Sequence, residues 1–515
     1  MPKIQRLLLL SVVVIISVSG LSYELVAGTM ATYLLGQSVT QFSFATGWFL
    51  AAMGFGSYLS RFVKKNIYYF LFNIQILIAI IGGFSAGIMF FSFAATDTLY
   101  PIFIVLAFII GSGIGLEIPI LLRLMRHYKI LSVAVSDVFT FDYIGALFAS
   151  VLFPLAILPF LGLVRASIFF GFLNLIAAGL ILTFVPKTKR SYFYSVLSLS
   201  FVLLVVGFIG AEKVTNWMEN LLYQDAIVYS SNSKYQRIVI TKWKDDTRLY
   251  LDGNVQFSTV DEAMYHEPIV HIPISFLKDK PKTALVLGGG DGLVIRELLK
   301  YESIETITLV ELDPAIIDLF KNHPVLKQIP QNSLNSPKVN IVIADAFNWL
   351  KNKENKTKFD FIVADLPDPN SHSLGKLYTI AFYLYVYRHL ENNGIFVTQS
   401  TSPTFAPDAY YCIQDTIKNA TEIFEKSQTG WEVYSYHLYI PSFGDWGFHI
   451  TGKNILSLKE KNEISVETEY LTDELAGSFF AFPKNARKDG EISINNLNNQ
   501  ILVKLYSRSW PRWYR

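Results

Sequence analysis

The sequence predicts two unlike parts: an N-terminal all-α transmembrane bundle of about seven spans, and a small β domain followed by a mostly parallel, doubly wound α/β sheet. Three observations predict this organisation. Charge is unevenly distributed, long apolar stretches are confined to the first 211 residues, and strand and helix patterns alternate after Pro281. A chain of 515 residues is also long enough to form more than one hydrophobic core.

Charge separates the two parts. The first 211 residues carry 12 basic and 5 acidic side chains, whereas the remaining residues carry 32 basic and 37 acidic ones. A basic, charge-poor part followed by an acidic, charge-rich part is typical of a membrane domain joined to a soluble one. The single cysteine, Cys412, excludes an intramolecular disulfide bond and a cysteine-based metal cluster.

Seven apolar stretches of roughly 20 residues predict about seven membrane spans in residues 1–211. They cover residues 7–33, 41–62, 67–93, 99–122, 138–160, 164–185 and 192–211. A signal peptide would explain only the first stretch, so targeting does not account for the pattern. The segments "GFGSY" and "GSGIG" within the spans are expected to allow close helix packing.

Basic residues gather between alternate spans, which predicts a cytoplasmic N-terminus. The clusters are Lys3 and Arg6; Arg61, Lys64 and Lys65; Arg123, Arg126 and Lys129; and Lys187, Lys189 and Arg190. Seven crossings from that start would put the C-terminal part outside the cell. The alternatives are a re-entrant or interfacial stretch, or an extra crossing hidden in the long first stretch.

Three acidic residues, Glu24, Glu117 and Asp142, lie within or beside the spans. Ionisable groups at membrane depth are costly and usually face a bundle interior or a cavity. These residues therefore either form a polar site for a cation or make ordinary interhelical hydrogen bonds. Glu117 is close to Arg123 in sequence, so an interfacial position is a further interpretation.

A linker at 212–225 and a small β domain at 226–275 are expected to begin the second part. The expected strands are the runs "IVYSS", "YQRIVITKW", "TRLYLDG" and "NVQFSTV", with turns at Asn232-Ser233, Asp245-Asp246 and Asp252-Gly253. An α/β domain is expected at 276–455, followed by a polar C-terminal extension at 456–515. The extension ends in "LYSRSWPRWYR", which either packs on the domain or lies at the membrane surface.

Alternating strands and helices beyond Pro281 predict a Rossmann-like sheet that binds ligands at the carboxyl ends of its strands. The expected strands are "TALVLGGG", "TITLVELD", "VNIVIAD", "FDFIVADL" and "GIFVTQS", and helices are expected at 293–300 and 314–322.

Five carboxylates follow these strands: Asp291, Glu311, Asp345, Asp365 and Asp368. Asp291 lies in the glycine loop "GGGDG", and Glu311 follows Gly288 by 23 residues, the spacing of an acid that binds ribose hydroxyls. Singly, Asp291 could cap a helix, and Asp365 and Asp368 could form turns. Crowded together without a cation they would repel one another. The set predicts a cationic, phosphate-free nucleoside, such as an S-adenosylmethionine derivative, and a cationic second substrate.

Several motifs then recur in order from about Tyr235 to Gly447. They are "YQRI", "LDGNVQFSTVDEAMYHE", "GGGDG", "VELD", "DAF", "DLPDP" and "IPSFGDWGF". Together they resemble the spermidine synthase (polyamine aminopropyltransferase) family, in its membrane-fused, multi-span branch. The resemblance implies an S-adenosylmethionine-methyltransferase-type fold. It also implies a transferase that moves the aminopropyl group of decarboxylated S-adenosylmethionine to an amine such as putrescine, giving spermidine and methylthioadenosine.

The resemblance also assigns roles to residues. Asp365 is implied as the base, with Tyr265 assisting it, and Tyr265, Asp365 and Asp368 are implied to bind the polyamine. The implied cofactor-binding residues are Gln236, Gln256, His266, Gly288, Gly290, Asp291, Glu311, Asp345 and Ala346. Within this set, Asp291 would hold the aminopropyl amine, Glu311 the ribose and Asp345 the adenine. No metal and no nucleic acid are implied.

Three departures from the family pattern leave the acceptor amine open: Leu293, Ala346 and Phe443. Two other functions are compatible with these residues: an enzyme that uses intact S-adenosylmethionine, by methyl transfer or by internal displacement, and a non-catalytic polyamine sensor or transporter. A multi-pass protein of the bacterial inner membrane is expected, in contact with the lipid bilayer, and a homo-oligomer is compatible with the resemblance. Because the decarboxylated cofactor is made in the cytosol, a cytoplasmic catalytic domain is expected.

Overall fold

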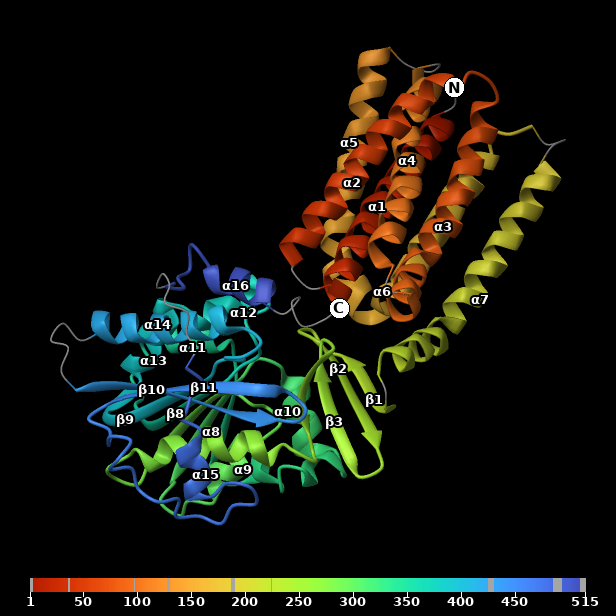
Figure 1. The fold of residues 1–515 in the computed structure, drawn as a ribbon. Coiled ribbons are helices and arrows are strands. Elements are labelled where there is room, and N and C mark those ends of the chain that lie inside the picture. Colours follow the sequence, from red (N-terminus) through yellow and green to blue (C-terminus); the bar gives the residue numbers. More distant parts are fainter. Residues whose placement is uncertain are drawn as a thin grey trace. The chain divides into compact units, whose positions relative to one another are not determined.

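The chain divides into two compact units, Met1–Ala226 and Ile227–Arg515 (Figure 1). A computed structural model describes residues 3–35, 38–96, 98–126, 130–186, 190–223, 225–424, 430–484 and 493–509.

Seven long helices make up the described part of the first unit (Figure 1). They are α1 (Lys3–Leu35), α2 (Ser38–Leu59), α3 (Ile67–Thr96), α4 (Leu99–Arg126), α5 (Leu131–Leu152), α6 (Leu158–Leu182) and α7 (Arg190–Leu222), with a short helix η1 (Ser60–Phe62) after α2. Helix α1 packs against α2 to α6, and α7 packs on α3 and α6. Apolar side chains fill the interior and also cover the outside: Phe160 is 84% exposed and Leu199 is 72% exposed.

Five helical stretches among the described residues are long and apolar enough to cross a membrane, two fewer than expected. They are Ile4–Leu34, Ile67–Ala95, Leu99–Arg126, Leu131–Leu182 and Arg190–Met218. The difference has two sources. Serine, threonine and glycine dilute the apolar character of α2, and α5 and α6 form one continuous apolar stretch through the π-helical segment η2 (Phe153–Ile157).

Glycines allow α2 and α4 to pack closely, as expected. A Cβ atom at Gly56 would overlap the carbonyl oxygen of Ser112, and one at Gly115 would overlap the carbonyl oxygen of Met53. The two backbones are therefore in direct contact, which confirms the packing role predicted for "GFGSY" and "GSGIG".

Glu117 lies in the interior of the bundle. It is 1% exposed and accepts a hydrogen bond from Gln75 of α3. Arg123 does not pair with it, because its guanidinium donates to the carbonyl oxygens of Ser60 and Val63, each at 2.7 Å. Of the interpretations considered, these contacts support interhelical hydrogen bonding for Glu117.

The second unit begins with a four-stranded sheet in the order β1-β2-β3-β4. Its strands are β1 (Ala226–Asn232), β2 (Arg237–Trp243), β3 (Asp246–Leu251) and β4 (Asn254–Ser258). Asp252 and Gly253 join β3 to β4 with φ values of 49° and 81°, the positive values that a tight two-residue hairpin turn requires. The expected strands and this turn are confirmed.

A seven-stranded sheet follows, in the order β10-β11-β9-β8-β5-β6-β7. Its strands are β5 (Thr283–Gly288), β6 (Thr306–Glu311), β7 (Val339–Ile343), β8 (Phe359–Asp365), β9 (Leu390–Gln399), β10 (Trp431–Ile440) and β11 (Gly444–Lys453). Strands β5 to β9 are parallel, as predicted from the sequence, whereas β10 and β11 form an antiparallel hairpin at one edge that was not predicted.

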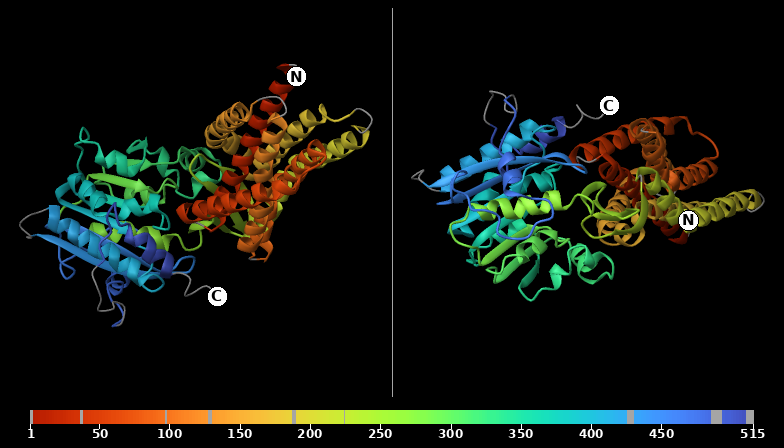
Figure 2. Two further views of the ribbon diagram at one scale, coloured as in Figure 1. Left: turned by 90° about the horizontal axis from the view of Figure 1, so that it is seen from above. Right: turned by 60° about the horizontal axis from the view of Figure 1, so that its bottom comes forward.

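Helices cover both faces of this sheet, and each face has its own apolar core (Figures 1 and 2). One layer contains α8 (Ala263–Ser275), α9 (Leu293–Leu299), α10 (Pro314–Asn322) and α15 (Asp473–Ser478); the other contains α11 (Ala346–Lys351), α13 (Ile380–Arg388), α14 (Pro407–Phe424) and α16 (Ile501–Ser509). Short helices are α12 (His372–Gly375), η4 (Leu326–Gln328), η5 (Ser333–Asn335) and η6 (Lys376–Tyr378). Helix α8 lies within the span expected to be a β domain, and it packs on α9 and on β9.

The described part of the C-terminal extension packs on the α/β domain. Leu471 and Ala476 belong to the core on the α8 side, and Leu502 belongs to the core on the α14 side. The end of the chain was expected either to pack on the domain or to lie at the membrane surface. Up to Ser509 it packs on the domain. The final residues, 510–515, lie outside the described part.

Candidate active site

The carboxyl ends of β5, β6 and β8 bring the glycine loop next to two carboxylates. Gly288 pairs with Asp365 on the neighbouring strand. Its φ is 80°, and a Cβ atom at this position would overlap the carbonyl oxygen of Asp365, so only glycine fits here. A Cβ atom at Gly290 would lie 2.9 Å from Oε2 of Glu311. The loop backbone is therefore held against both acids.

Asp291 caps a helix with one carboxylate oxygen and leaves the other available to a ligand. Its Oδ1 accepts the N–H of Leu293 at 2.9 Å, so the side chain caps the start of α9. Its Oδ2 receives no hydrogen bond from the described residues. Burial raises the pKa of Asp291 to about 6; the charge of His266 opposes this shift, and the charge of Asp365 adds to it.

Tyr265 of α8 joins Asp365 at the end of β8. The tyrosine hydroxyl donates a hydrogen bond of 2.7 Å to Oδ1 of the carboxylate. Burial raises the pKa of Asp365, although the charge of His266 and the bond from Tyr265 oppose the shift. A carboxylate with a raised pKa and a fixed orientation is suited to accept a proton.

Asp368, three residues further on, accepts hydrogen bonds from three elements. The donors are Tyr506 Oη at 2.7 Å, Gln399 Nε2 at 3.4 Å and Thr401 Oγ1 at 3.5 Å. Burial raises the pKa of Asp368 to about 6 against these three bonds. Thr401 has a φ of 56°, which is a strained conformation for a β-branched residue.

His266 connects the site to a buried ion-pair network. Its Nδ1 lies 2.9 Å from Oε2 of Glu262, and Arg296 binds the same carboxylate through two nitrogens at 2.7 and 2.9 Å. Burial raises the pKa of Glu262, but His266 and Arg296 together lower it to about 2. Burial also lowers the pKa of His266, yet Glu262, Asp291 and Asp365 raise it above its ordinary value. These acids therefore favour the protonated form of His266.

Glu311 ends β6 and faces a second group of polar residues. Its Oε1 accepts the N–H of Asp313 at 2.9 Å, and Asp313 Oδ2 accepts from Gln236 Nε2 at 3.0 Å. Burial raises the pKa of Glu311 to about 7, against the backbone bonds from Asp313 and Leu312. Gln236 of the small sheet is thus linked to Glu311 through one residue.

Asp345 and Gln256 form their contacts with residues outside the group of acids described above. Asp345 Oδ1 caps α11 by accepting the N–H of Asn348 at 2.9 Å, and its Oδ2 forms an ion pair of 2.7 Å with Lys376. Ala346 follows as the first, buried residue of α11. The Gln256 side chain donates to carbonyl oxygens of its own strand, at Asn254 and Val255. None of its bonds reaches the other candidate residues.

Four residues, which we call the carboxylate cluster, have raised pKa values: Asp291, Glu311, Asp365 and Asp368. Within the described residues, no lysine or arginine forms an ion pair with any of them. Crowded, partly desolvated carboxylates of this kind favour cationic ligands.

Several residues that form hydrogen bonds within the site were not predicted from the sequence. They are Glu262, Asp313, Lys376, Tyr378, Gln399, Thr401 and Tyr506. Gln399 ends β9, so the strand-end rule that found the acids could also have found it. Tyr506 had no such signal, because it comes from the C-terminal extension.

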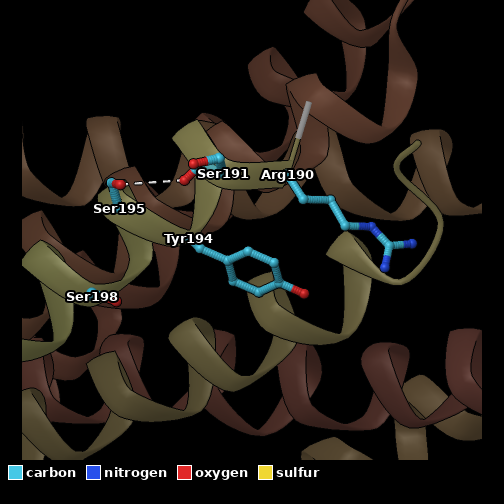
Figure 3. Close-up of a pocket in the computed structure, with 5 residues that line it drawn as sticks. All are labelled: Arg190, Ser191, Tyr194, Ser195 and Ser198. Carbon is cyan, nitrogen blue, oxygen red and sulfur yellow. Dashed lines mark hydrogen bonds between the residues drawn. The ribbon is translucent and has the colours of Figure 1, made fainter. Parts of the chain in front are cut away.

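A shallow polar hollow at the start of α7 is separate from this cluster (Figure 3). Arg190 there donates to the carbonyl oxygens of Val185 and Thr183 at the end of α6, at 2.7 and 2.9 Å. Ser195 donates to the carbonyl oxygen of Ser191 one turn earlier, at 3.2 Å. These bonds serve the backbone of the helical ends and give the hollow no catalytic group.

The chain is similar to several known proteins. Residues 262–456 match the spermine/spermidine synthase domain. A polyamine aminopropyltransferase of Leptospira interrogans is 41% identical, in an alignment covering 97% of this chain and 98% of that protein. Another, from Oceanobacillus iheyensis, is 36% identical, covering 97% and 96%. A solved spermidine synthase bound to the transition-state analogue AdoDATO is 27% identical, covering 50% of this chain and 86% of that one, with a TM-score of 0.45.

The protein is therefore a transferase. It belongs to the polyamine aminopropyltransferase family, as the near full-length relatives at this level of identity establish.

Proposed function

We propose that this enzyme transfers the aminopropyl group of decarboxylated S-adenosylmethionine to a diamine such as putrescine, giving spermidine and methylthioadenosine. The observation that carries the proposal is the carboxylate cluster, four buried acids whose pKa values burial raises. A cation bound beside them would favour their ionised forms. One cation is the aminopropyl ammonium and sulfonium of the cofactor, and the other is the diamine.

The reaction needs a proton acceptor and no acid. As the amine nitrogen forms a bond to the aminopropyl carbon, the carbon–sulfur bond breaks and its electron pair neutralises the sulfonium. The obstacle is the amine, which with a pKa of about 10 is mostly protonated at neutral pH, as free lysine is. Asp365 takes its proton, and Tyr265, at 2.7 Å, keeps that carboxylate pointed at the nitrogen.

The proposal also assigns residues to the cofactor. The Asp291 Oδ2 atom binds the aminopropyl ammonium, and Glu311 accepts from the ribose hydroxyls. Gln236, through Asp313, and the glycines Gly288 and Gly290 hold the nucleoside close to the backbone. Asp345 with Ala346 lies beside the adenine, while His266 balances the charge of the cluster.

Asp291 also selects the decarboxylated cofactor. The α-carboxylate of intact S-adenosylmethionine would lie beside this buried, acidic side chain, which is 8% exposed. Two carboxylates in one desolvated pocket repel each other, so the intact form binds more weakly.

The first unit anchors the enzyme in the bacterial inner membrane, with the catalytic unit on the cytoplasmic side where its cofactor is made. Apolar side chains that face outward along the helices, such as Leu147, Phe160, Leu199 and Ile209, support contact with lipid. A reporter fused after Arg515 tests the side: activity characteristic of the cell exterior would refute the cytoplasmic orientation.

The activity is tested with the purified full-length chain in detergent. Decarboxylated or intact S-adenosylmethionine is supplied with or without putrescine, and methylthioadenosine and spermidine are measured by mass spectrometry. We expect equal amounts of both products only from the decarboxylated form with the diamine. Consumption of the intact form without an amine would overturn the proposal.

Two variants sharpen this test. Asp365→Asn removes the proton acceptor and should abolish turnover, and Asp318→Asn is its matched control. Asp318 is an exposed residue of α10, and among the described residues its side chain accepts a hydrogen bond only from the Asn322 side chain one turn away. Equal loss in both variants would count against a role for Asp365.

A further inference from the structure

The C-terminal extension supplies a side chain to the carboxylate cluster. Tyr506 of α16 lies beyond residue 456, where the match to the family domain ends. Its hydroxyl donates to Oδ2 of Asp368 at 2.7 Å, which is shorter than the bonds from Gln399 and Thr401 to the same carboxylate. The extension therefore contributes directly to the proposed acceptor site.

Buried contacts fix the position of α16. Leu502 is fully buried and Val503 is 5% exposed. A Cβ atom at Gly375 would come within 2.5 Å of Val503 Cγ2, so α12 and α16 are in close contact. These contacts hold Tyr506 in one place on the domain.

A buried asparagine ties the start of the extension helix to the same region. Asn495 is fully buried, and its Nδ2 donates to the carbonyl oxygens of Gly375 and Tyr378 at 3.1 and 3.0 Å. Its Oδ1 accepts the N–H of Leu502 at 3.4 Å. Tyr378 in turn contacts Gln399, so the network reaches the groups around Asp368.

Two tyrosines bind two different carboxylates of the proposed acceptor site. Tyr265 binds Asp365, the proposed proton acceptor, whereas Tyr506 binds Asp368, three residues further along the chain. Tyr506 therefore binds a carboxylate other than the proposed proton acceptor. It is half-buried, and its ring packs against the apolar core that contains Leu502.

We propose that Tyr506 is a specificity-determining residue, which orients Asp368 for the far ammonium of a short diamine and closes the site to longer triamines. This inference rests on the proposed aminopropyl transfer to a diamine. The phenol hydroxyl occupies one lone pair of Asp368 Oδ2 and leaves the other positions of the carboxylate to the ammonium. The ring occupies the space that the extra aminopropyl arm of a triamine would need.

Two substitutions separate the hydroxyl from the ring. Tyr506→Phe removes only the hydrogen bond; we expect KM for putrescine to rise about tenfold, with kcat changed less than about threefold, because a bond to a charged group is lost. Tyr506→Ala also opens the end of the site. There the ratio of kcat/KM for spermidine as acceptor to that for putrescine should rise about tenfold or more.

A pH profile provides a readout that a purely structural role would not change. The bond from Tyr506 lowers the pKa of Asp368, so Tyr506→Phe should move the acidic limb of kcat/KM for putrescine to higher pH. The matched control is Tyr439→Phe, because Tyr439 on β10 is 67% exposed. It should leave KM, acceptor preference and pH profile as in the wild type.

The outcomes distinguish this inference from the proposed function. No turnover of decarboxylated cofactor and putrescine by the wild type would overturn the proposed function. Wild-type turnover with an unchanged KM and pH profile in Tyr506→Phe would overturn the role of Tyr506 alone. An equal rise in KM for the cofactor, or a lowered melting temperature in Tyr506→Phe, would make Tyr506 a structural residue. If Tyr506→Ala does not fold, Tyr506→Phe decides the question.

Discussion

The hydroxyl of Tyr265 and the carboxylate of Asp365 are 2.7 Å apart, although 100 residues separate them in the chain. Helix α8 and strand β8 meet at this bond, at the carboxyl edge of the parallel strands. The bond orients the carboxylate and keeps its pKa from rising as far as burial alone would raise it.

Removing this bond should slow the reaction without weakening cofactor binding. For Tyr265→Phe we expect kcat to fall roughly tenfold, and for Asp365→Asn roughly 10²–10⁴-fold, the range of general-base contributions. Without the tyrosine bond the pKa of Asp365 rises, so the acidic limb of the Tyr265→Phe pH profile moves to higher pH. Methylthioadenosine release at saturating substrates measures both effects. An unchanged pH profile would exclude Tyr265 as the residue that orients the base.

The carboxylate cluster should make stability and cofactor binding depend on pH in opposite senses. The pKa values of Asp291 and Glu311 are raised to about 6 and 7, so the folded state holds protons that the unfolded state has released. Their contribution to stability is therefore present at low pH and lost as pH rises through 6 and 7. Binding of the cationic cofactor requires the ionised acids, so its affinity should rise over the same interval.

Calorimetric titration with decarboxylated S-adenosylmethionine below and above this interval measures the affinity, and thermal melting measures the stability. In Glu311→Gln one titrating group is absent, so both pH dependences should become shallower. Steeper or identical dependences in this variant would assign the effect to other groups.

Gly290 should be required for cofactor affinity. A Cβ atom in Gly290→Ala would lie 2.9 Å from Cγ and Oε2 of Glu311, so that carboxylate must move away from the position in which we propose that it binds the ribose. We expect KM for the cofactor to rise tenfold or more, about 1.4 kcal/mol of lost binding, with a smaller effect on KM for putrescine. Gly477→Ala is the control, since a Cβ atom there meets nothing within 4 Å. Equal effects on both substrates would contradict the role given to Glu311.

Glu267 should stabilise the second unit through the C-terminal extension. It is 1% exposed, and its carboxylate accepts the N–H groups of Glu469, Tyr470 and Leu471 at 2.6, 2.9 and 2.9 Å. In Glu267→Gln an amide NH₂ group, which cannot accept a hydrogen bond, replaces one carboxylate oxygen beside these donors. The free energy of unfolding should fall by about 1–3 kcal/mol. The melting temperature of this unit should fall by roughly 5 °C.

The matched control for Glu267→Gln is Glu302→Gln, at an exposed site after α9. Cleavage by a protease within residues 456–484 should become faster in Glu267→Gln and remain unchanged in the control. Equal melting temperatures in the two variants would show that the Glu267 carboxylate does not stabilise the extension.

The parallel core of the second unit and four of its acids were predictable because their signals are local. Buried strands such as Thr283–Gly288 are short apolar runs, and the ends of parallel strands share one edge, so Asp291, Glu311 and Asp365 could be brought together from sequence. The same rule also named Asp345. Its ion pair with Lys376 depends on a residue 31 positions away and could not be predicted.

Helix α8 and Tyr506 show what local patterns do not reveal. Pro268 and Pro273 lie inside α8 and argue against a helix, yet almost all of its residues are buried, and this packing outweighs the local preference. Tyr506 reaches Asp368 across 138 residues of sequence, and no spacing rule connects the two. Gln256 was assigned by resemblance, and its contacts with its own strand could be seen only in three dimensions.

The left-handed backbone of Thr401 has a consequence for anyone who evolves or engineers this enzyme. Glycine at 401 would relieve a strain of roughly 1–3 kcal/mol and would be enriched by any screen that rewards heat resistance alone. The same change deletes the hydroxyl that approaches Asp368. A library ranked by survival after heating would therefore drift away from amine recognition at this position, and only a screen that scores product as well would keep threonine.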